Sequence, residues 1–183
     1  MPNDHDQFTY HFRELYPKLC RFLEGLVGKS ACAHDLAQET MLRLFQQSDL
    51  IPAEEIRFWV FRVARNLALN ELERQRTRSK LSGWVVSLFG SPPRTPEVEL
   101  VQKEETKLVF SLIGRLPDHQ RAALLLREQE EMSYSEIAHV LGVTESKVKI
   151  DLFRARMVLR EQLIQARHPQ NQEHPPARKG AAQ

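Results

Sequence analysis

The sequence has few cysteines, and it contains no long run of hydrophobic residues. Its two cysteines, Cys20 and Cys32, are too few for a disulfide scaffold, and no CxxC pair indicates a zinc site. No stretch approaches the roughly 18 consecutive apolar residues that a membrane-spanning helix requires. We therefore expect no membrane span and no zinc centre.

Signals of export and of catalysis are also missing. The first residues, MPNDHDQFTYHF, are polar and acidic where a secretory signal carries Lys or Arg before an apolar stretch, which predicts a cytoplasmic protein. His11, His34, His119 and His139 are scattered and have no partners at metal-ligand spacing. An enzyme is therefore not expected, and we predict no catalytic residues, no cofactor and no metal site.

Signals for β-strands are scarce. The 183 residues include only seven Gly and no alternating apolar run of strand length. Hydrophobic residues make up 42% of the chain, which is enough for one core or two small ones. The sequence thus predicts an all-α protein.

Charge is uneven along the chain, although 26 Lys and Arg nearly balance 24 Asp and Glu. One basic block covers residues 57–80, a second covers residues 147–160, and an acidic stretch at 97–105 separates them. Two separated basic blocks can hold a polyanion at two points. On charge alone, a pair of solvated helix faces explains the pattern equally well.

Apolar residues at helical spacing predict three helices in the first part of the chain. The first covers about residues 8–27 and contains Pro17, which we expect to kink or split it. The second begins near Ser30, and the third follows a loop at residues 47–54. Three amphipathic helices joined by short loops predict a compact bundle, which we assign to residues 1–76.

The composition changes after Arg76. Residues 77–96 hold several glycines and prolines and predict a flexible linker, although the apolar segment at 84–90 favours docking on a domain or partner. A second helical domain is expected at residues 97–167. Residues 168–183 are poor in apolar side chains and predict a disordered tail.

The second domain contains the pattern of a helix-turn-helix. Ser133 and Glu136 have the spacing of a capping box, Gly142 ends the helix that they open, and Thr144 can cap a longer basic helix. A short helix, a turn with Gly and a helix rich in Lys and Arg are typical of this motif. The pattern favours DNA binding over a plain helical hairpin.

Four segments together resemble the extracytoplasmic-function (ECF, group IV) sigma factors of bacterial RNA polymerase. They are AHDLAQETMLRLF at 33–45, FWVFRVARNLALNEL at 58–72, LPDHQRAALLLRE at 116–128 and SYSEIAHVLGVTESKVKIDLFRARMVL at 133–159. The resemblance spans nearly the whole chain apart from the linker and tail. It implies two helical domains, region 2 and region 4, which bind core RNA polymerase and the minus-10 and minus-35 promoter elements. It further implies control by an anti-sigma factor.

The resemblance also implies roles for individual residues. The polar face of the second helix would bind the clamp helices of the polymerase; its members are Asp35, Gln38, Glu39 and Arg43. A solvated face explains the same residues. Leu124 and Leu125 resemble a surface that grips the polymerase flap tip, and a buried leucine pair fits them equally well.

Two further sets of residues would bind the promoter. The minus-10 set comprises Ser48, Asp49, Arg57, Arg62, Arg65 and Asn66. The minus-35 set comprises Thr144, Lys147, Lys149, Ile150, Phe153 and Arg154. We expect the cations of both sets to be accessible to DNA.

Several positions depart from the family pattern or have two interpretations. Asp151 stands where Arg is common and would repel phosphate unless it pairs with Lys147 or Arg154, or accepts from a cytosine amine. Glu130 and Glu131 stand where Gly is common. Trp59 lies on the apolar face of its helix, which favours core packing over base stacking.

Two other functions fit part of the sequence. A stand-alone helix-turn-helix regulator gives no role to residues 1–76. A sigma mimic that sequesters an anti-sigma factor usually carries a receiver domain, and the required βα pattern is missing from this sequence. We therefore expect a promoter-specificity subunit whose two domains bind DNA effectively once core polymerase fixes their spacing.

Overall fold

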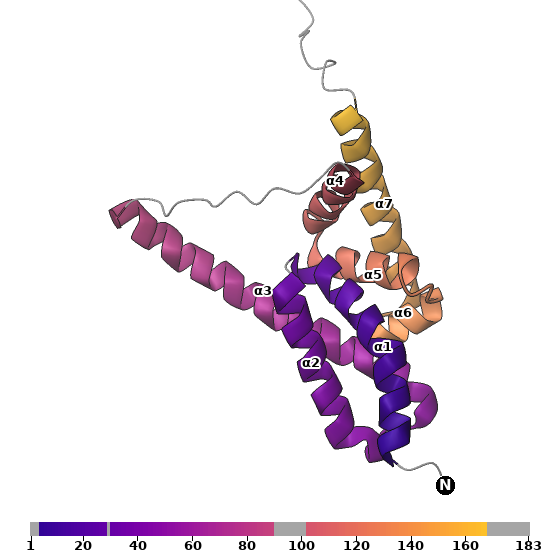
Figure 1. The fold of residues 1–183 in the computed structure, drawn as a ribbon. Coiled ribbons are helices and arrows are strands. Elements are labelled where there is room, and N and C mark those ends of the chain that lie inside the picture. Colours follow the sequence, from indigo (N-terminus) through magenta and orange to yellow (C-terminus); the bar gives the residue numbers. More distant parts are fainter. Residues whose placement is uncertain (1–3, 29, 90–101, 168–183) are drawn as a thin grey trace, which may run out of the picture.

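The computed structural model describes residues 4–28, 30–89 and 102–167, and these residues form helices without any strand (Figure 1). The first half contains α1 (Asp4–Val27), α2 (Ser30–Gln47), two short 3-10 helices, η1 (Ser48–Leu50) and η2 (Ala53–Glu55), and α3 (Ile56–Phe89). The second half contains α4 (Gln102–Gly114), α5 (Asp118–Glu128), α6 (Tyr134–Leu141) and α7 (Glu145–Arg167). The prediction of an all-α protein is confirmed.

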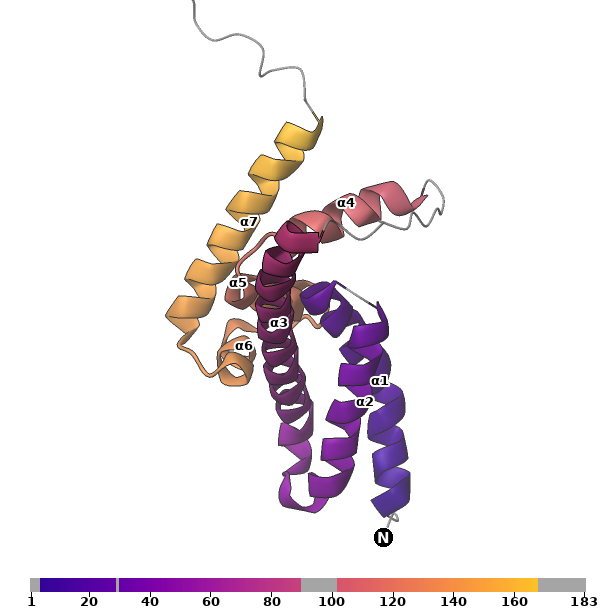
Figure 2. The same cartoon turned by 90° about the vertical axis from the view of Figure 1, so that its left-hand side faces the viewer.

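Helices α1, α2 and the first part of α3 pack side by side and form the N-terminal module (Figure 2). Its core is the apolar stripe of α1, in which Leu19, Phe22 and Leu23 are fully buried. Phe22 meets Phe61 of α3 edge-on, with ring centroids 5.3 Å apart. Pro17 does not split α1, which continues on both sides of it.

Helix α3 is longer than the sequence predicts. The first domain is expected to end at Arg76, but α3 continues to Phe89, so the first part of the predicted linker is helical and projects from the bundle (Figure 1). Residues 77–81 favour a helix or tolerate it, and the single Gly83 costs only about 1 kcal/mol relative to Ala. The rest of the predicted linker and the predicted tail lie outside the described residues.

Helices α4 to α7 form the C-terminal module, which contains the predicted helix-turn-helix. The Ser133 side chain accepts a hydrogen bond from the Glu136 amide at 3.2 Å, and the Glu136 carboxylate accepts one from the Ser133 amide at 2.7 Å. Gly142 ends α6 with a φ of 66°, in the left-handed region that favours Gly. The Thr144 hydroxyl accepts from the Lys147 amide at 3.2 Å and caps α7. The capping box, the turn and the second helix are confirmed.

The two modules are in direct contact. One continuous cluster of buried residues runs from α1 through α3 and α5 to α7. Helix α5 packs against α1, and α6 packs against α3. The sequence predicted two helical domains, and the structure adds that they bury a common interface. We call this contact between α1, η2 and α3 on one side and α4, α5 and α6 on the other the module interface.

Candidate nucleic-acid and polymerase interfaces

The polar face of α2 is rigid and largely exposed. Its opposite face, with Ala37, Met41 and Leu44, is buried in the bundle. On the outer face the Arg43 guanidinium donates to the Glu39 carboxylate at 2.8 Å, and both side chains are partly open to solvent. Asp35 and Gln38 are exposed beside this pair. The four residues of the predicted polymerase contact therefore lie on one accessible helix face.

The loop between α2 and α3 lies at one end of the N-terminal module. Ser48 and Asp49 belong to η1, where the Ser48 hydroxyl donates to the Phe45 carbonyl at 3.4 Å and contacts the Asp49 carboxylate at 3.5 Å. The next residue, Leu50, is 82% exposed. No role is predicted for Leu50 from the sequence, although a large apolar residue in a predicted polar loop is unusual.

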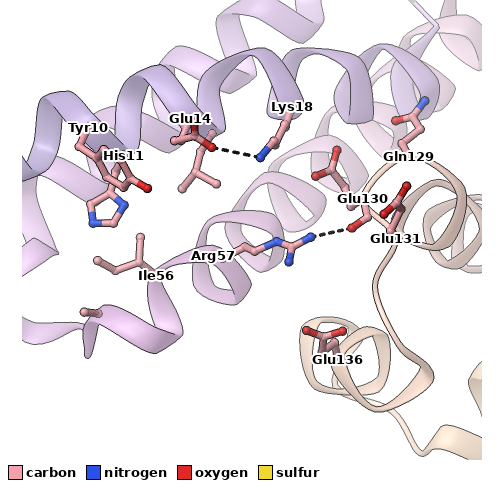
Figure 3. Close-up of a pocket in the computed structure, with 12 residues that line it drawn as sticks. Tyr10, His11, Glu14, Lys18, Ile56, Arg57, Gln129, Glu130, Glu131 and Glu136 are labelled. Atoms are coloured by element: carbon pink, nitrogen blue, oxygen red, sulfur yellow. Dashed lines mark hydrogen bonds and ion pairs between the residues drawn. The ribbon is translucent and has the colours of Figure 1, made fainter.

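Two of the minus-10 arginines point toward the C-terminal module. The Arg57 guanidinium donates to the backbone carbonyl of Glu130 at 2.6 Å (Figure 3). The Arg62 guanidinium donates to the backbone carbonyl of His139 at 3.0 Å. Both side chains are half-buried and each uses one guanidinium nitrogen in this contact, and their role in DNA binding stays a prediction.

Arg65 and Asn66 of the minus-10 set contact each other. The Arg65 guanidinium donates to the side-chain carbonyl of exposed Asn66 at 3.1 Å, within α3. Burial lowers the pKa of Arg65 below its usual range. Trp59 is partly buried and packs against the core, as its place on the apolar face predicts.

The minus-35 set on α7 is open to solvent. Phe153 is 65% exposed and Ile150 is 46% exposed. Lys149 and Arg154 are exposed beside them. One helix face therefore combines apolar groups with cations, which is the chemistry that recognises base edges and phosphates in a major groove.

Asp151 does not belong to this open face. It is 3% exposed, and its carboxylate pairs with the Lys147 ammonium and lies 3.5 Å from the His119 ring. The pairing with Lys147 is one of the three arrangements that the sequence left open, beside a pairing with Arg154 and a contact with a cytosine amine. Asp151 therefore adds no repulsion toward phosphate on the exposed surface, and Lys147 is already engaged within α7.

Leu124 and Leu125 point in different directions. Leu124 lines an apolar groove of about 590 Å³ between α4 and α7. The other apolar residues of this groove are Val109, Ile113, Leu159, Leu163 and Ile164. Leu125 is 2% exposed, and its side chain faces Gly25 of α1 across the module interface. Both leucines are buried, with Leu124 only 5% exposed, as the alternative interpretation predicts, and Leu124 alone of the two lines the groove.

Arg121 is a structural residue that the sequence analysis did not single out. It is buried, and its guanidinium donates to the carbonyls of Leu26 at 2.6 Å, Gly114 at 2.6 Å and Leu116 at 2.9 Å. The last carbonyls of a helix have no partner within it, so Arg121 caps the ends of α1 and α4 together. No local pattern marks this role, since Leu26 lies 95 residues away in the chain.

A cavity of about 580 Å³ lies at the module interface (Figure 3). Its walls include Glu14 and Lys18 of α1, Arg57 of α3, and Glu130 and Glu131 of the turn between α5 and α6. Lys18 pairs with Glu14 at 3.3 Å. A polar pocket that is open to solvent therefore borders the apolar contact between the two modules.

Glu130 is the most unusual group at this surface. It is 5% exposed, and one carboxylate oxygen, Oε1, is buried without a hydrogen-bond partner. Burial raises the pKa of Glu130, while Arg57, Arg21 and Lys18 oppose this shift. The neighbouring Glu131 has a φ of 54°, which accounts for the frequent Gly at this place in the family pattern.

In the part of the chain that the structure describes, no three His, Cys, Asp or Glu side chains group as they would around a metal ion. No described helix has the length and apolarity needed to cross a membrane.

Both modules match models of known domain families. Residues 11–78 match Sigma-70 region 2, and residues 107–159 match Sigma-70, region 4. The ECF RNA polymerase sigma factor SigM of Bacillus subtilis is 30% identical over 141 residues, which cover 76% of this chain and 85% of that protein. The chain belongs to the ECF RNA polymerase sigma factors. This sigma factor is therefore a transcription factor that directs core RNA polymerase to promoters.

Other relatives agree with this membership. SigL of Mycobacterium tuberculosis, also an ECF sigma factor, is 31% identical over 144 residues, covering 78% of this sigma factor and 80% of SigL. The fold is similar to that of RpoE from Bartonella quintana, solved with the anti-sigma factor NepR, with a TM-score of 0.67 and 23% identity. That match covers 86% of this chain and 97% of RpoE. CnrH, solved with the cytosolic domain of CnrY, gives a TM-score of 0.66 at 20% identity, covering 89% of this chain and 90% of CnrH.

Proposed function

We propose that this sigma factor binds core polymerase through two surfaces, one on each module. The first is the polar face of α2, where Asp35, Gln38, Glu39 and Arg43 offer carboxylates, an amide and one guanidinium on a rigid helix. An exposed face of this kind binds a basic partner mainly through electrostatic complementarity. The second is the apolar groove between α4 and α7 with Leu124 at its wall, which fits an apolar segment of the polymerase.

The minus-10 element is assigned to the η1 loop and the adjoining part of α3. Ser48 and Asp49 carry polar groups for a base edge, and Arg57, Arg62, Arg65 and Asn66 carry donors for the phosphates. Base capture requires polar edge contacts and nearby cations, and this region supplies both.

The minus-35 element is assigned to α7. The exposure of Lys149, Ile150, Phe153 and Arg154 on one face of the second helix of a helix-turn-helix carries this assignment. Thr144 and Lys147 lie at the amino end of the same helix, where free amides and the helix dipole favour phosphate. In this arrangement the Lys147 ammonium pairs with Asp151, and its backbone amide donates to the Thr144 hydroxyl.

The sigma factor supplies specificity, and catalysis belongs to the polymerase alone. We infer that an anti-sigma factor regulates it, since the solved relatives RpoE and CnrH are described in complexes with NepR and CnrY. We assign the protein to the cytoplasm, where polymerase and promoters are found.

The test is transcription in vitro with purified core polymerase and sheared DNA from the host. We expect defined transcripts that appear only when the sigma factor is added. The Lys149→Ala and Arg154→Ala double variant should lose these transcripts and still bind core polymerase. Transcripts that persist unchanged in the double variant would contradict the assignment to α7.

A further inference from the structure

Lys147 lies at the end of α7 that meets DNA in a helix-turn-helix. The amino-terminal residues of the second helix of this motif contact base edges, and phosphates lie beside them. Thr144 caps this end of α7, and the Lys147 amide in the first turn donates to the Thr144 hydroxyl at 3.2 Å. A free ammonium at this place would be within reach of the DNA backbone.

The Lys147 ammonium is instead held by a buried acid. It pairs with both oxygens of the Asp151 carboxylate, one helical turn further along α7. The Asp151 side chain is 4% exposed, whereas that of Lys147 is 44% exposed. The ring of His119 on α5 lies 3.5 Å from the same carboxylate but carries charge only when it is protonated. Lys147 is therefore the main compensation for the buried carboxylate.

The stability of α7 alone does not explain this ion pair. A Lys in the first turn lies at the positive end of the helix dipole, where a cation is unfavourable. A Lys that precedes its acid by four residues is also the weaker of the two possible orders for a pair within a helix. The ammonium therefore has two competing acceptors, the Asp151 carboxylate and a promoter phosphate.

The buried carboxylate is the stronger acceptor of the two. Removing one partner of a buried ion pair leaves an uncompensated charge away from water, which costs far more than an exposed pair contributes. A phosphate contact at the surface of duplex DNA is exposed, and salt weakens it. We therefore expect the ammonium to stay on Asp151 when α7 meets DNA.

We propose that Asp151 is a positioning residue that withholds the Lys147 ammonium from the promoter backbone and thereby lowers the affinity of α7 for duplex DNA. The proposal rests on the function proposed above, because it assumes that α7 enters the major groove of the minus-35 element. With Lys147 withheld, α7 makes one phosphate contact fewer than its basic sequence offers. Phosphate contacts carry no sequence information, so Asp151 changes the affinity for all sequences equally.

The substitution Asp151→Asn in the full chain tests the proposal. The amide keeps the shape of the carboxylate but cannot form an ion pair, so the Lys147 ammonium becomes available to phosphate. Glu161→Gln is the matched control, since it removes one carboxylate from an exposed site on the same helix. Lys147→Gln added to Asp151→Asn should abolish the gain in affinity. Circular dichroism checks that each variant is folded.

The salt dependence of DNA binding is the decisive measurement. Fluorescence anisotropy with a short duplex of random sequence gives the affinity between about 50 and 200 mM salt. One new phosphate contact should steepen the slope of log K against log salt by about 0.9. The gain of Asp151→Asn over the wild type should therefore be about threefold larger at the lower salt concentration. A loosened fold alone would not tighten binding in this way.

Sequencing of the duplexes that each protein retains from a random library gives the base preferences. Asp151→Asn should keep the preferences of the wild type. A preference that changes at one base pair would overturn the proposal, because Asp151 would then contact a base, as an acceptor for a cytosine amine does. An unchanged salt slope in Asp151→Asn would also overturn it.

Two further outcomes keep the proposal testable on its own. A slope below that of the wild type in the variant with both substitutions would show that Lys147 already binds phosphate, which would overturn the proposal even if Asp151→Asn alone did not fold. If Lys149→Ala with Arg154→Ala binds duplex DNA like the wild type, the proposed function of α7 fails. If that variant binds weakly and Asp151→Asn behaves like the wild type, the role of Asp151 alone fails.

Discussion

The two cationic surfaces of the molecule differ in their surroundings. On α7, Lys149 and Arg154 stand on an exposed face, and the acidic Asp151 of the same helix is turned inward and pairs with Lys147. On α3, Arg57 and Arg62 are bound by carbonyls of the other module. A basic block in a sequence therefore does not establish an available binding surface, because the availability of its donors depends on what packs against them.

The largest effect that we expect comes from removing Arg121 of α5, which links the C-terminal module to α1 of the N-terminal module. Arg121→Leu leaves three buried carbonyls without a donor, each costing about 1–3 kcal/mol. We expect the free energy of unfolding to fall by about 3–5 kcal/mol. Urea denaturation followed by circular dichroism measures this change. Half-buried Arg127 of the same helix is unsuitable as a control because it donates to the Met132 carbonyl. Arg13→Leu on α1 is the control, and equal losses in both variants would contradict the capping role.

The next effect concerns the open face of α7. Lys149→Ala and Arg154→Ala together should weaken binding of holoenzyme to a promoter, since each good base contact contributes about 1–3 kcal/mol. A gel-shift titration with core polymerase measures the loss. Arg13→Ala, exposed on α1, serves as the control. If the double variant and the control bind the promoter equally well, Lys149 and Arg154 contribute no more to binding than another exposed cation does, which would contradict the assignment to α7.

A smaller effect is expected at the turn that covers Arg57. Glu131 holds a φ of 54°, and a left-handed conformation costs a residue with a Cβ about 1–2 kcal/mol. Because Gly loses more entropy on folding, Glu131→Gly should stabilise the protein by up to about 1 kcal/mol. Gln129, with a φ of −96°, is the control, and Gln129→Gly should destabilise. Chemical denaturation of both variants measures the free energy of unfolding. A loss of stability in Glu131→Gly would show that the contacts of the Glu131 side chain contribute more than the strain of its left-handed backbone costs.

The smallest effect concerns pH and the covered surface. Burial raises the pKa of Glu130 in the packed form above its ordinary value of 4.5, despite Lys18 and Arg21 on α1 and Arg57 on α3. The packed form therefore binds this proton more tightly than an open form, so packing is favoured as pH falls and weakens as pH rises through the raised pKa.

Scattering at a series of pH values tests this direction. The radius of gyration should increase as pH rises from 4.5 toward neutrality in the wild type and change less in Glu130→Gln. The variant is needed because other ionisable side chains, those of His11, Glu14, Glu131 and Glu136, line the same cavity. An identical pH response in both proteins would assign the effect to those groups.

Much of the fold could be predicted because its signals are local. The capping box of Ser133 and Glu136 and the left-handed Gly142 each depend on residues within one helical turn. The exposed face of α2 follows equally from helical periodicity. The length of α3 was underestimated, since a single Gly is a weak break when no proline stops the helix before Phe89.

Contacts between distant residues could not be predicted in the same way. Arg57 binds a carbonyl 73 residues away, and Arg62 binds one 77 residues away. Nothing near either arginine indicates such a partner. The opposite orientations of Leu124 and Leu125 likewise depend on α1, which reaches α5 only through the docking of the modules.

The sequence by itself determined the helices, their caps, the helix-turn-helix and the membership of the sigma factor family. Helical periodicity and capping depend on residues within a few positions of each other, so these signals do not require tertiary contacts. Only the tertiary structure decided which cations are open and which are engaged, and that Asp151 faces inward. Those outcomes depend on how the two modules pack against each other. This packing places backbone carbonyl oxygens of the C-terminal module beside the guanidinium groups of Arg57 and Arg62.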